Sequence, residues 1–286
     1  MAVAPPPPRS GPPPTRREGG PGSRDRSDLG PRILAAIPAI IFGIVIVGWG
    51  GGVFLAGVVA LGLVCLHELY TMAAELRPVR LGGFLGLIGL ACAAFFGEGM
   101  LVLLALVATI PVVFAVGLVQ ARPPGVTGAA VTLLGVMWVG LAIAHAVLLR
   151  ELEHGGALIV SILVGTFAGD TGAYVGGRTF GRTLLAPSIS PNKTREGLVV
   201  GMVTAVIFVW LAGLYQDWMS GTQALLLGLA VAAAAPVGDL FESWVKRDLG
   251  AKDTGRLFGA HGGALDRLDA ALFTLVVGYY VWSAML

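Results

Sequence analysis

Long apolar runs, separated by short polar connections, occupy most of the chain after Arg32. We count nine of them, at 33–49, 52–74, 82–97, 99–119, 128–149, 156–176, 197–215, 221–242 and 264–285. Most approach the roughly 20 residues that an α-helix needs to cross a bilayer core, and none shows the sustained alternation typical of membrane β-strands. The third run is short, which leaves a tilted helix or a re-entrant segment open. The pattern predicts an all-α, polytopic integral membrane helical bundle with about nine transmembrane helices.

The composition agrees with this class. Hydrophobic residues make up 56% of the 286 residues and charged residues 13%, whereas soluble domains carry about 25% charged residues. A soluble globule of this size is therefore excluded. Residues 1–31 are rich in Pro, Gly, Arg and Ser, so we expect a disordered tail that buries no apolar surface. Residues 32–286 are expected to form one transmembrane domain.

The distribution of Lys and Arg predicts the orientation of the bundle. Six arginines precede the first apolar run, so the N-terminus is expected in the cytoplasm. With nine spans, loops 75–81, 120–127, 177–196 and 243–263 lie on the same side and hold most of the other basic residues, including Arg122 and Arg256. The opposite loops hold only Arg150. A composition rich in Ala, Gly and Arg favours a bacterial origin, and hence the plasma membrane.

Acidic residues in or beside the apolar runs indicate a functional site, because charge within a membrane is costly. They are Glu68, Asp170, Asp239, Glu242, Asp266 and Asp269, all toward the predicted cytoplasmic side. One such acid could simply be a buried partner of an arginine. The two most basic loops join these spans at the same end as the acids. Acidic and basic residues together indicate a site for phosphate and a divalent cation. Mg²⁺ takes carboxylates, water and substrate phosphates, and Lys and Arg bind the remaining phosphate charge.

Two polar stretches carry a family resemblance. Residues 243–269, which we name the signature stretch, contain Ser243, Lys246-Arg247, Lys252-Asp253, His261-Gly-Gly263 and Asp266-Arg-Leu-Asp269. Asp170-Thr-Gly-Ala-Tyr174 and Ser190-Pro-Asn-Lys-Thr-Arg-Glu-Gly197 form the second element. Both resemble the phosphatidate cytidylyltransferase (CDP-diacylglycerol synthase) family. The resemblance covers roughly 33–286 and is most specific at 165–270.

The resemblance implies transfer of CMP from CTP to phosphatidic acid, which gives CDP-diacylglycerol and pyrophosphate in phospholipid biosynthesis. It implies Mg²⁺, K⁺ as a possible second ion, membrane lipid as surroundings, a homodimer, an active site that faces the cytoplasm and no nucleic-acid partner. We expect the metal at Asp239 and Asp266, with Asp269 or alternatively Asp170 completing the site. The expected catalytic residues are Asp239, Asp266, Lys246, Arg247 and Lys252. The expected substrate-binding residues are Asp170, Tyr174, Ser190, Lys193, Thr194, Arg195, Glu196, His261, Gly262, Gly263 and Arg267.

Other classes remain as alternatives. A CDP-alcohol phosphotransferase would carry Asp-Gly-x-x-Ala-Arg followed by spaced aspartates, and the sequence has no such run. A lipid-linked kinase that uses CTP has a closer architecture, and only its product would distinguish it. A transporter would show inverted repeats and broken helices near the midplane, and we see no repeat.

Overall fold

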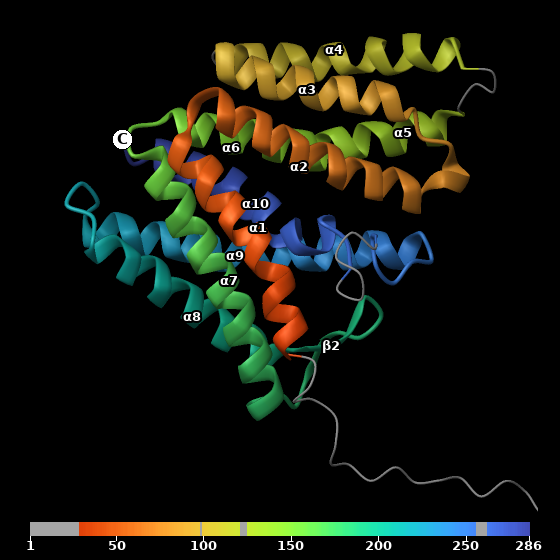
Figure 1. Cartoon of the computed structure of the whole chain (residues 1–286). Coiled ribbons are helices and arrows are strands. Elements are labelled where there is room, and N and C mark those ends of the chain that lie inside the picture. The colour runs from red at the N-terminus through yellow and green to blue at the C-terminus, as the bar shows by residue number, and fades with distance from the viewer. Residues whose placement is uncertain (1–28, 98, 121–124, 256–261) are drawn as a thin grey trace, which may run out of the picture.

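The structure is a computed structural model that describes residues 29–97, 99–120, 125–255 and 262–286, which are mostly helical (Figure 1). The elements in chain order are α1 (Leu29–Trp49), α2 (Gly51–Met72), η1 (Ala74–Leu76), α3 (Arg80–Phe96), α4 (Gly99–Leu118), α5 (Val126–Gly135), η2 (Val136–Gly140), α6 (Leu141–Glu151), α7 (Gly155–Phe180), β1 (Leu184–Ala186), β2 (Ser190–Thr194), α8 (Arg195–Leu214), α9 (Gly221–Asp248) and α10 (Leu265–Ser283). The element η2 is a π-helical turn, and it joins α5 and α6 into one continuous helix.

The all-helical membrane class is confirmed. Every predicted apolar run overlaps a helix, and six helices of the described residues are long and apolar enough to cross a membrane. They are α2, α4, the continuous helix Val126–Glu151, α7, α8 and α9. The number of crossings and the orientation stay predictions. Residues 1–28 of the predicted tail, together with Arg122, Arg256 and His261, lie outside the described residues.

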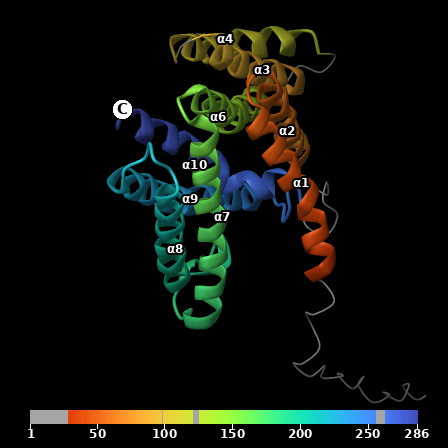
Figure 2. The same cartoon turned by 60° about the vertical axis from the view of Figure 1, so that its left-hand side comes forward.

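The helices form two edges with a packed centre. In both views α3 and α4 lie side by side at one edge, and α7 and α8 lie side by side at the other (Figures 1 and 2). The helices α2, α6, α9 and α10 lie between them. Their interface is apolar: Leu66, Leu87, Leu158, Leu227 and Leu265, from five different helices, are fully buried. Burial of such side chains is the main stabilising contribution of the centre.

A short β-hairpin interrupts the helical pattern. Strands β1 and β2 are antiparallel, with Leu184 paired to Thr194 and Ala186 paired to Ser190, and they connect α7 to α8. The sequence predicted only a loop at 177–196. Hydropathy finds membrane-length runs and does not detect strands of three and five residues. The hairpin is part of the candidate site described below.

The helix α9 continues six residues beyond its apolar run, and this corrects the predicted loop 243–263. Lys246 and Arg247 therefore lie in the last turn of a helix, where cations interact favourably with the helix dipole. The N–H of Ala251 donates to the carbonyl of Lys246 (2.8 Å), and the N–H of Gly250 donates to that of Arg247 (3.2 Å). This is a Schellman termination, and Gly250 has the positive φ of 67° that it requires.

Close packing between α7 and α8 depends on Gly201. A Cβ at this position would lie 2.7 Å from the Cβ of Ala173 and 2.8 Å from the carbonyl oxygen of Gly169. We expect Gly201→Val to destabilise the protein by about 1–3 kcal/mol, the usual range for overpacking. Thermal unfolding in detergent micelles tests this. The control is Val203→Leu on an exposed position of the same helix, and equal unfolding temperatures for the two variants would contradict the prediction.

Candidate active site

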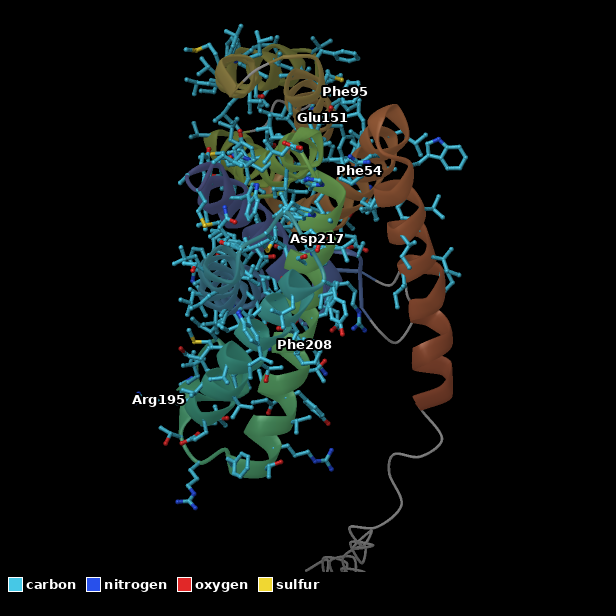
Figure 3. The ribbon with its side chains drawn as sticks, turned by 90° about the vertical axis from the view of Figure 1, so that its left-hand side faces the viewer. Phe54, Phe95, Glu151, Arg195, Phe208 and Asp217 are labelled. Atoms are coloured by element: carbon cyan, nitrogen blue, oxygen red, sulfur yellow. The ribbon has the colours of Figure 1, made fainter. Side chains whose placement is uncertain are left out.

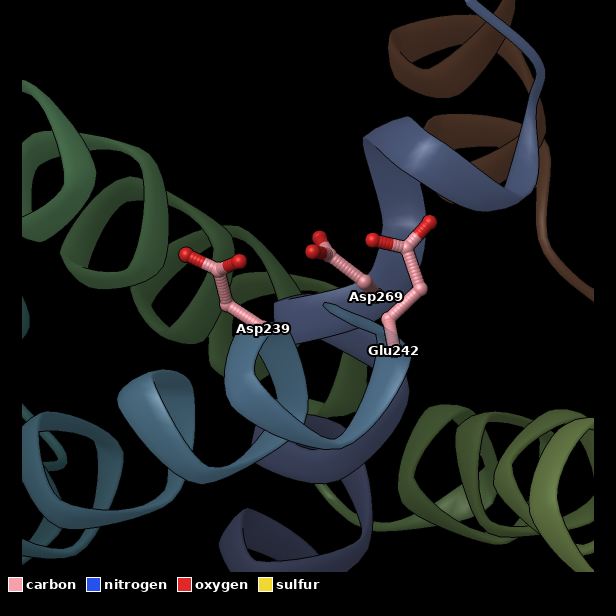
Figure 4. A group of neighbouring side chains, drawn as sticks. All are labelled: Asp239, Glu242 and Asp269. Atoms are coloured by element: carbon pink, nitrogen blue, oxygen red, sulfur yellow. The ribbon is translucent and has the colours of Figure 1, made fainter. Parts of the chain in front are cut away.

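Three carboxylates meet where α9 and α10 cross. Asp239 and Glu242 project from the same face of α9, and Asp269 projects from α10 (Figure 4). One oxygen from each of the three lies within 4.8 Å of the others. The adjacent Gly238 makes this approach possible, because a Cβ there would lie 2.6 Å from the carbonyl oxygen of Asp269 and 3.0 Å from the Cα of Ala270. We name Asp239, Glu242 and Asp269 the acid cluster.

Asp239 is half-buried, whereas the other two residues of the acid cluster are largely removed from solvent. Glu242 is 2% exposed and Asp269 is 9% exposed. In Figure 4 the carboxylate of Asp269 lies between the other two. The Oε1 atom of Glu242 is buried and has no hydrogen-bond partner among the residues that the structure describes. A buried carboxylate oxygen without a donor is unfavourable, so the cluster is suited to a cation.

Two lysines neutralise part of this charge. The Nζ atom of Lys246 lies 2.6 Å from Glu242 Oε2, one turn earlier on α9, and 2.8 Å from Asp266 Oδ1 on α10. Lys193 of β2 forms an ion pair with Asp239. The carboxylates of these residues and of Asp269 still outnumber the two ammonium groups. Four carboxyl groups thus lie beside two ammonium groups, and this surplus of oxygen ligands suits a cation.

Contacts between the β-hairpin and α9 place Lys193 beside the acid cluster. The Nε–H of Arg247 donates to the carbonyl of Ile189 (3.3 Å). The carboxylate of Glu196 accepts the backbone N–H groups of Arg182 (3.0 Å) and Thr183 (3.1 Å). Thr194 caps α8 by accepting the N–H of Gly197 (3.1 Å). Glu196 and Thr194, both predicted to bind substrate, thus form contacts within the hairpin and its junction with α8.

Asp266 organises the C-terminal part of the signature stretch. Its Oδ2 atom accepts the N–H of Thr254 (3.0 Å), the hydroxyl of Thr254 (2.9 Å) and the N–H of Gly263 (2.7 Å). Gly262 has a positive φ of 84°, which favours glycine there. Asp266 therefore links Thr254 and Gly263 to Lys246. Among the described residues, it is not one of the three carboxylates that form the acid cluster.

Of the other predicted residues, some lie near the acid cluster and others lie at exposed positions away from it. Asp170 of α7 interacts electrostatically with Asp239 and Lys193, and Ser190 begins β2. The hydroxyl of Tyr174 accepts a hydrogen bond from Arg178 (3.1 Å) on the exposed face of α7. Exposed positions are also found at Lys252, Arg195 and Arg267. Arg195 lies at the free end of the α7–α8 pair (Figure 3), away from the packed centre.

The sequence places Glu242 and Glu68 in the acidic set of the apolar runs but predicts no individual role for either. The spacing of Glu242 from Asp239 (three residues) and from Lys246 (four residues) was the available signal, since both intervals fall on one helix face. Thr254 was not singled out. Its contact with Asp266 depends on how the turn folds back, which no local pattern reveals.

Comparison with known proteins identifies the family of this chain. Residues 31–285 match the model of the cytidylyltransferase family. The chain is 40% identical to the phosphatidate cytidylyltransferase of Helicobacter pylori over 121 residues, covering 42% of this chain and 45% of that protein. It is 36% identical to that of Mycobacterium leprae over 151 residues (53% and 48%), and 40% identical to the Escherichia coli protein YnbB over 144 residues (49% and 48%).

These alignments span about half the length of the curated relatives. The family model, by contrast, covers nearly all of the chain after the predicted tail, including every residue of the acid cluster. The chain therefore belongs to the cytidylyltransferase family.

Proposed function

We propose that this protein transfers CMP from CTP to phosphatidic acid, giving CDP-diacylglycerol and pyrophosphate. The observation that carries the proposal is the acid cluster between α9 and α10, flanked by two lysines, in a chain whose described residues include six helices able to cross a membrane. Such a site suits a reaction between an anionic nucleotide and an anionic lipid. The relatives named phosphatidate cytidylyltransferase support the choice of substrates.

In the proposed reaction, a phosphate oxygen of phosphatidic acid attacks the α-phosphorus of CTP. One P–O bond forms, and the bond from that phosphorus to the bridging oxygen of the pyrophosphate group breaks. The attacking oxygen is already an anion at neutral pH, so no general base is required. Catalysis of this kind depends on positioning and on neutralising charge.

The residues of the acid cluster fit Mg²⁺, because hard divalent cations prefer carboxylate oxygens. Asp239, Glu242 and Asp269 would hold the ion, and the unpartnered Oε1 of Glu242 supports including that residue. When bound, the ion would neutralise phosphate charge. Asp266, also predicted as a ligand, binds Lys246, Thr254 and Gly263 in this structure. A role for K⁺ as a second ion stays a prediction.

Basic residues around the cluster are the proposed phosphate ligands. Lys193 and Arg247 lie between the hairpin and α9. Lys193 pairs with Asp239 of α9, and Arg247 of α9 donates to Ile189 of the hairpin. Lys252 and Arg267 lie at exposed positions of the signature stretch. These cationic side chains would bind the phosphate groups of CTP and of the lipid. We further propose a cytoplasmic active site in the plasma membrane and a homodimer.

The direct test is transfer of label by the protein purified in detergent and supplied with phosphatidic acid and Mg²⁺. With α-³²P CTP we expect label in a lipid product that depends on added phosphatidic acid. The control variant is Glu151→Gln, which removes an exposed carboxylate at the end of α6 (Figure 3) and should leave transfer unchanged. Lipid label from γ-³²P CTP, with none from the α-labelled nucleotide, would show a lipid kinase and contradict the proposal.

A further inference from the structure

Glu68 is a buried carboxylate that the proposed reaction does not use. It lies near the C-terminal end of α2, in the N-terminal half of the chain, and is 6% exposed. Charge in such a position is unfavourable unless it is compensated. The groups that Glu68 contacts come from the opposite end of the sequence, and they all belong to the signature stretch.

The carboxylate of Glu68 caps the N-terminus of α10. Its Oε1 accepts the N–H of Ala264 (3.0 Å), and its Oε2 accepts the N–H of Leu265 (2.9 Å). The first N–H groups of a helix have no partners within the helix, and a negative charge there is favoured by the helix dipole. The N-cap residue, Ala264, supplies no side-chain cap. A carboxylate from another helix therefore performs this role.

Glu68 also reaches the other described end of the turn. Its Oε2 lies 3.3 Å from the hydroxyl oxygen of the buried Thr254, whose single proton is shared between this oxygen and the nearer Oδ2 of Asp266 (2.9 Å). Two glycines enclose the carboxylate: a Cβ at Gly255 would lie 2.5 Å from Oε1, and a Cβ at Gly263 would lie 2.3 Å from Oε2. Gly255 and Gly263 thus lie against Glu68 on two sides, and a side chain at either position would have to displace its carboxylate.

These contacts connect Glu68 to the acid cluster. Thr254 and Gly263, which flank Glu68, also donate to Asp266. Asp266 in turn binds Lys246, and Lys246 binds Glu242 of the acid cluster. The placement of Asp266 and Lys246 therefore depends on the two ends of the turn being held together.

We propose that Glu68 is a positioning residue. It holds Thr254 beside the first residues of α10, so that Asp266 orients Lys246 toward the acid cluster. Its effect on catalysis rests on the proposed function, whereas its contact with the turn does not. Partners that orient the groups around a metal site typically change activity about 10- to 100-fold when they are replaced, so we expect a loss of this size from Glu68.

The test compares Glu68→Gln with Glu75→Gln, which removes an exposed carboxylate seven residues further along the chain. The amide keeps the size of Glu68 but replaces one acceptor oxygen with a donor, which then faces an N–H group. Hydrogen–deuterium exchange by mass spectrometry should show faster exchange in peptides containing Ala264 and Leu265, and unchanged exchange in α7 and α8. The kcat of transfer should fall about 10-fold or more, with the KM for phosphatidic acid unchanged.

A second variant approaches the same contact from the turn. Gly255→Ala places a methyl group against Glu68 Oε1 and must push the carboxylate away from its donors, so exchange and kcat should change in the same direction. Unchanged exchange at Ala264 and Leu265 in Glu68→Gln would overturn the proposal. So would faster exchange throughout the chain, since that would show a general structural role. If the unmodified protein transfers no label, the proposed function fails, and the exchange result still decides whether Glu68 holds the turn.

Discussion

Replacing Asp239 with asparagine is expected to lower the rate of CMP transfer about 10²- to 10³-fold, because it would weaken the binding of the cation that neutralises developing phosphate charge. Asp239 belongs to the acid cluster and also pairs with Lys193 of the hairpin. Asparagine keeps the shape of the side chain but removes its charge. The cluster would then bind a cation less tightly, and Lys193 would lose its anchor on α9.

The measurement is the initial rate of lipid labelling from α-³²P CTP at saturating Mg²⁺, together with the binding of Mn²⁺ followed by electron paramagnetic resonance. The matched control is Asp217→Asn, an exposed aspartate at the opposite end of α8 from Arg195 (Figure 3). Both proteins should unfold at similar temperatures. Transfer by Asp239→Asn within tenfold of the unmodified rate would remove Asp239 from the proposed catalytic residues.

Replacing Lys246 with methionine is expected to reduce both transfer and stability. Lys246 lies between Glu242 and Asp266, and the carboxylate of Glu242 is almost completely buried. Breaking a buried ion pair by removing one partner typically destabilises a protein by about 3–5 kcal/mol, because the remaining charge is uncompensated. We therefore expect a clearly lower unfolding temperature in detergent micelles, and at most residual labelling of lipid.

A second substitution separates the two effects of Lys246. In the double variant Lys246→Met/Glu242→Gln, the uncompensated charge of Glu242 is gone, so much of the stability should return while transfer stays low. The stability control is Lys252→Met, which removes an exposed lysine and should leave the unfolding temperature unchanged. If the single and double variants unfold at the same temperature, the ion pair with Glu242 does not contribute to stability.

Much of the fold was predictable because burial in lipid imposes a simple pattern. Long apolar runs must form helices, since only internal hydrogen bonds satisfy the backbone there. The ends of the helices were not predictable from that pattern. The helix α9 continues through Lys246 and Arg247 because its end is set by the Schellman turn at Gly250, and not by hydropathy. The hairpin of β1 and β2 was missed for a similar reason.

The candidate site was partly predictable. Asp239 and Asp269 were expected to lie together, and they do so because α9 and α10 cross at Gly238. The place of Glu242 beside them follows from helical spacing, although the sequence does not say which acid of a span faces its neighbour. The contact of Glu68 with Ala264 joins residues 196 positions apart. It follows only from the packing of α2 against the first turn of α10.

The same contact sets an order for the synthesis and insertion of the chain. The ribosome completes α2 long before it completes α10, so Glu68 enters the membrane before its N–H donors exist. Closing a contact over such a separation is entropically slow compared with local helix formation. A chain that stops before Ala264 therefore retains a carboxylate that no N–H group of α10 can satisfy. The candidate site can therefore be completed only after α10 has been made, because its N–H groups are the last partners of Glu68 to be synthesised.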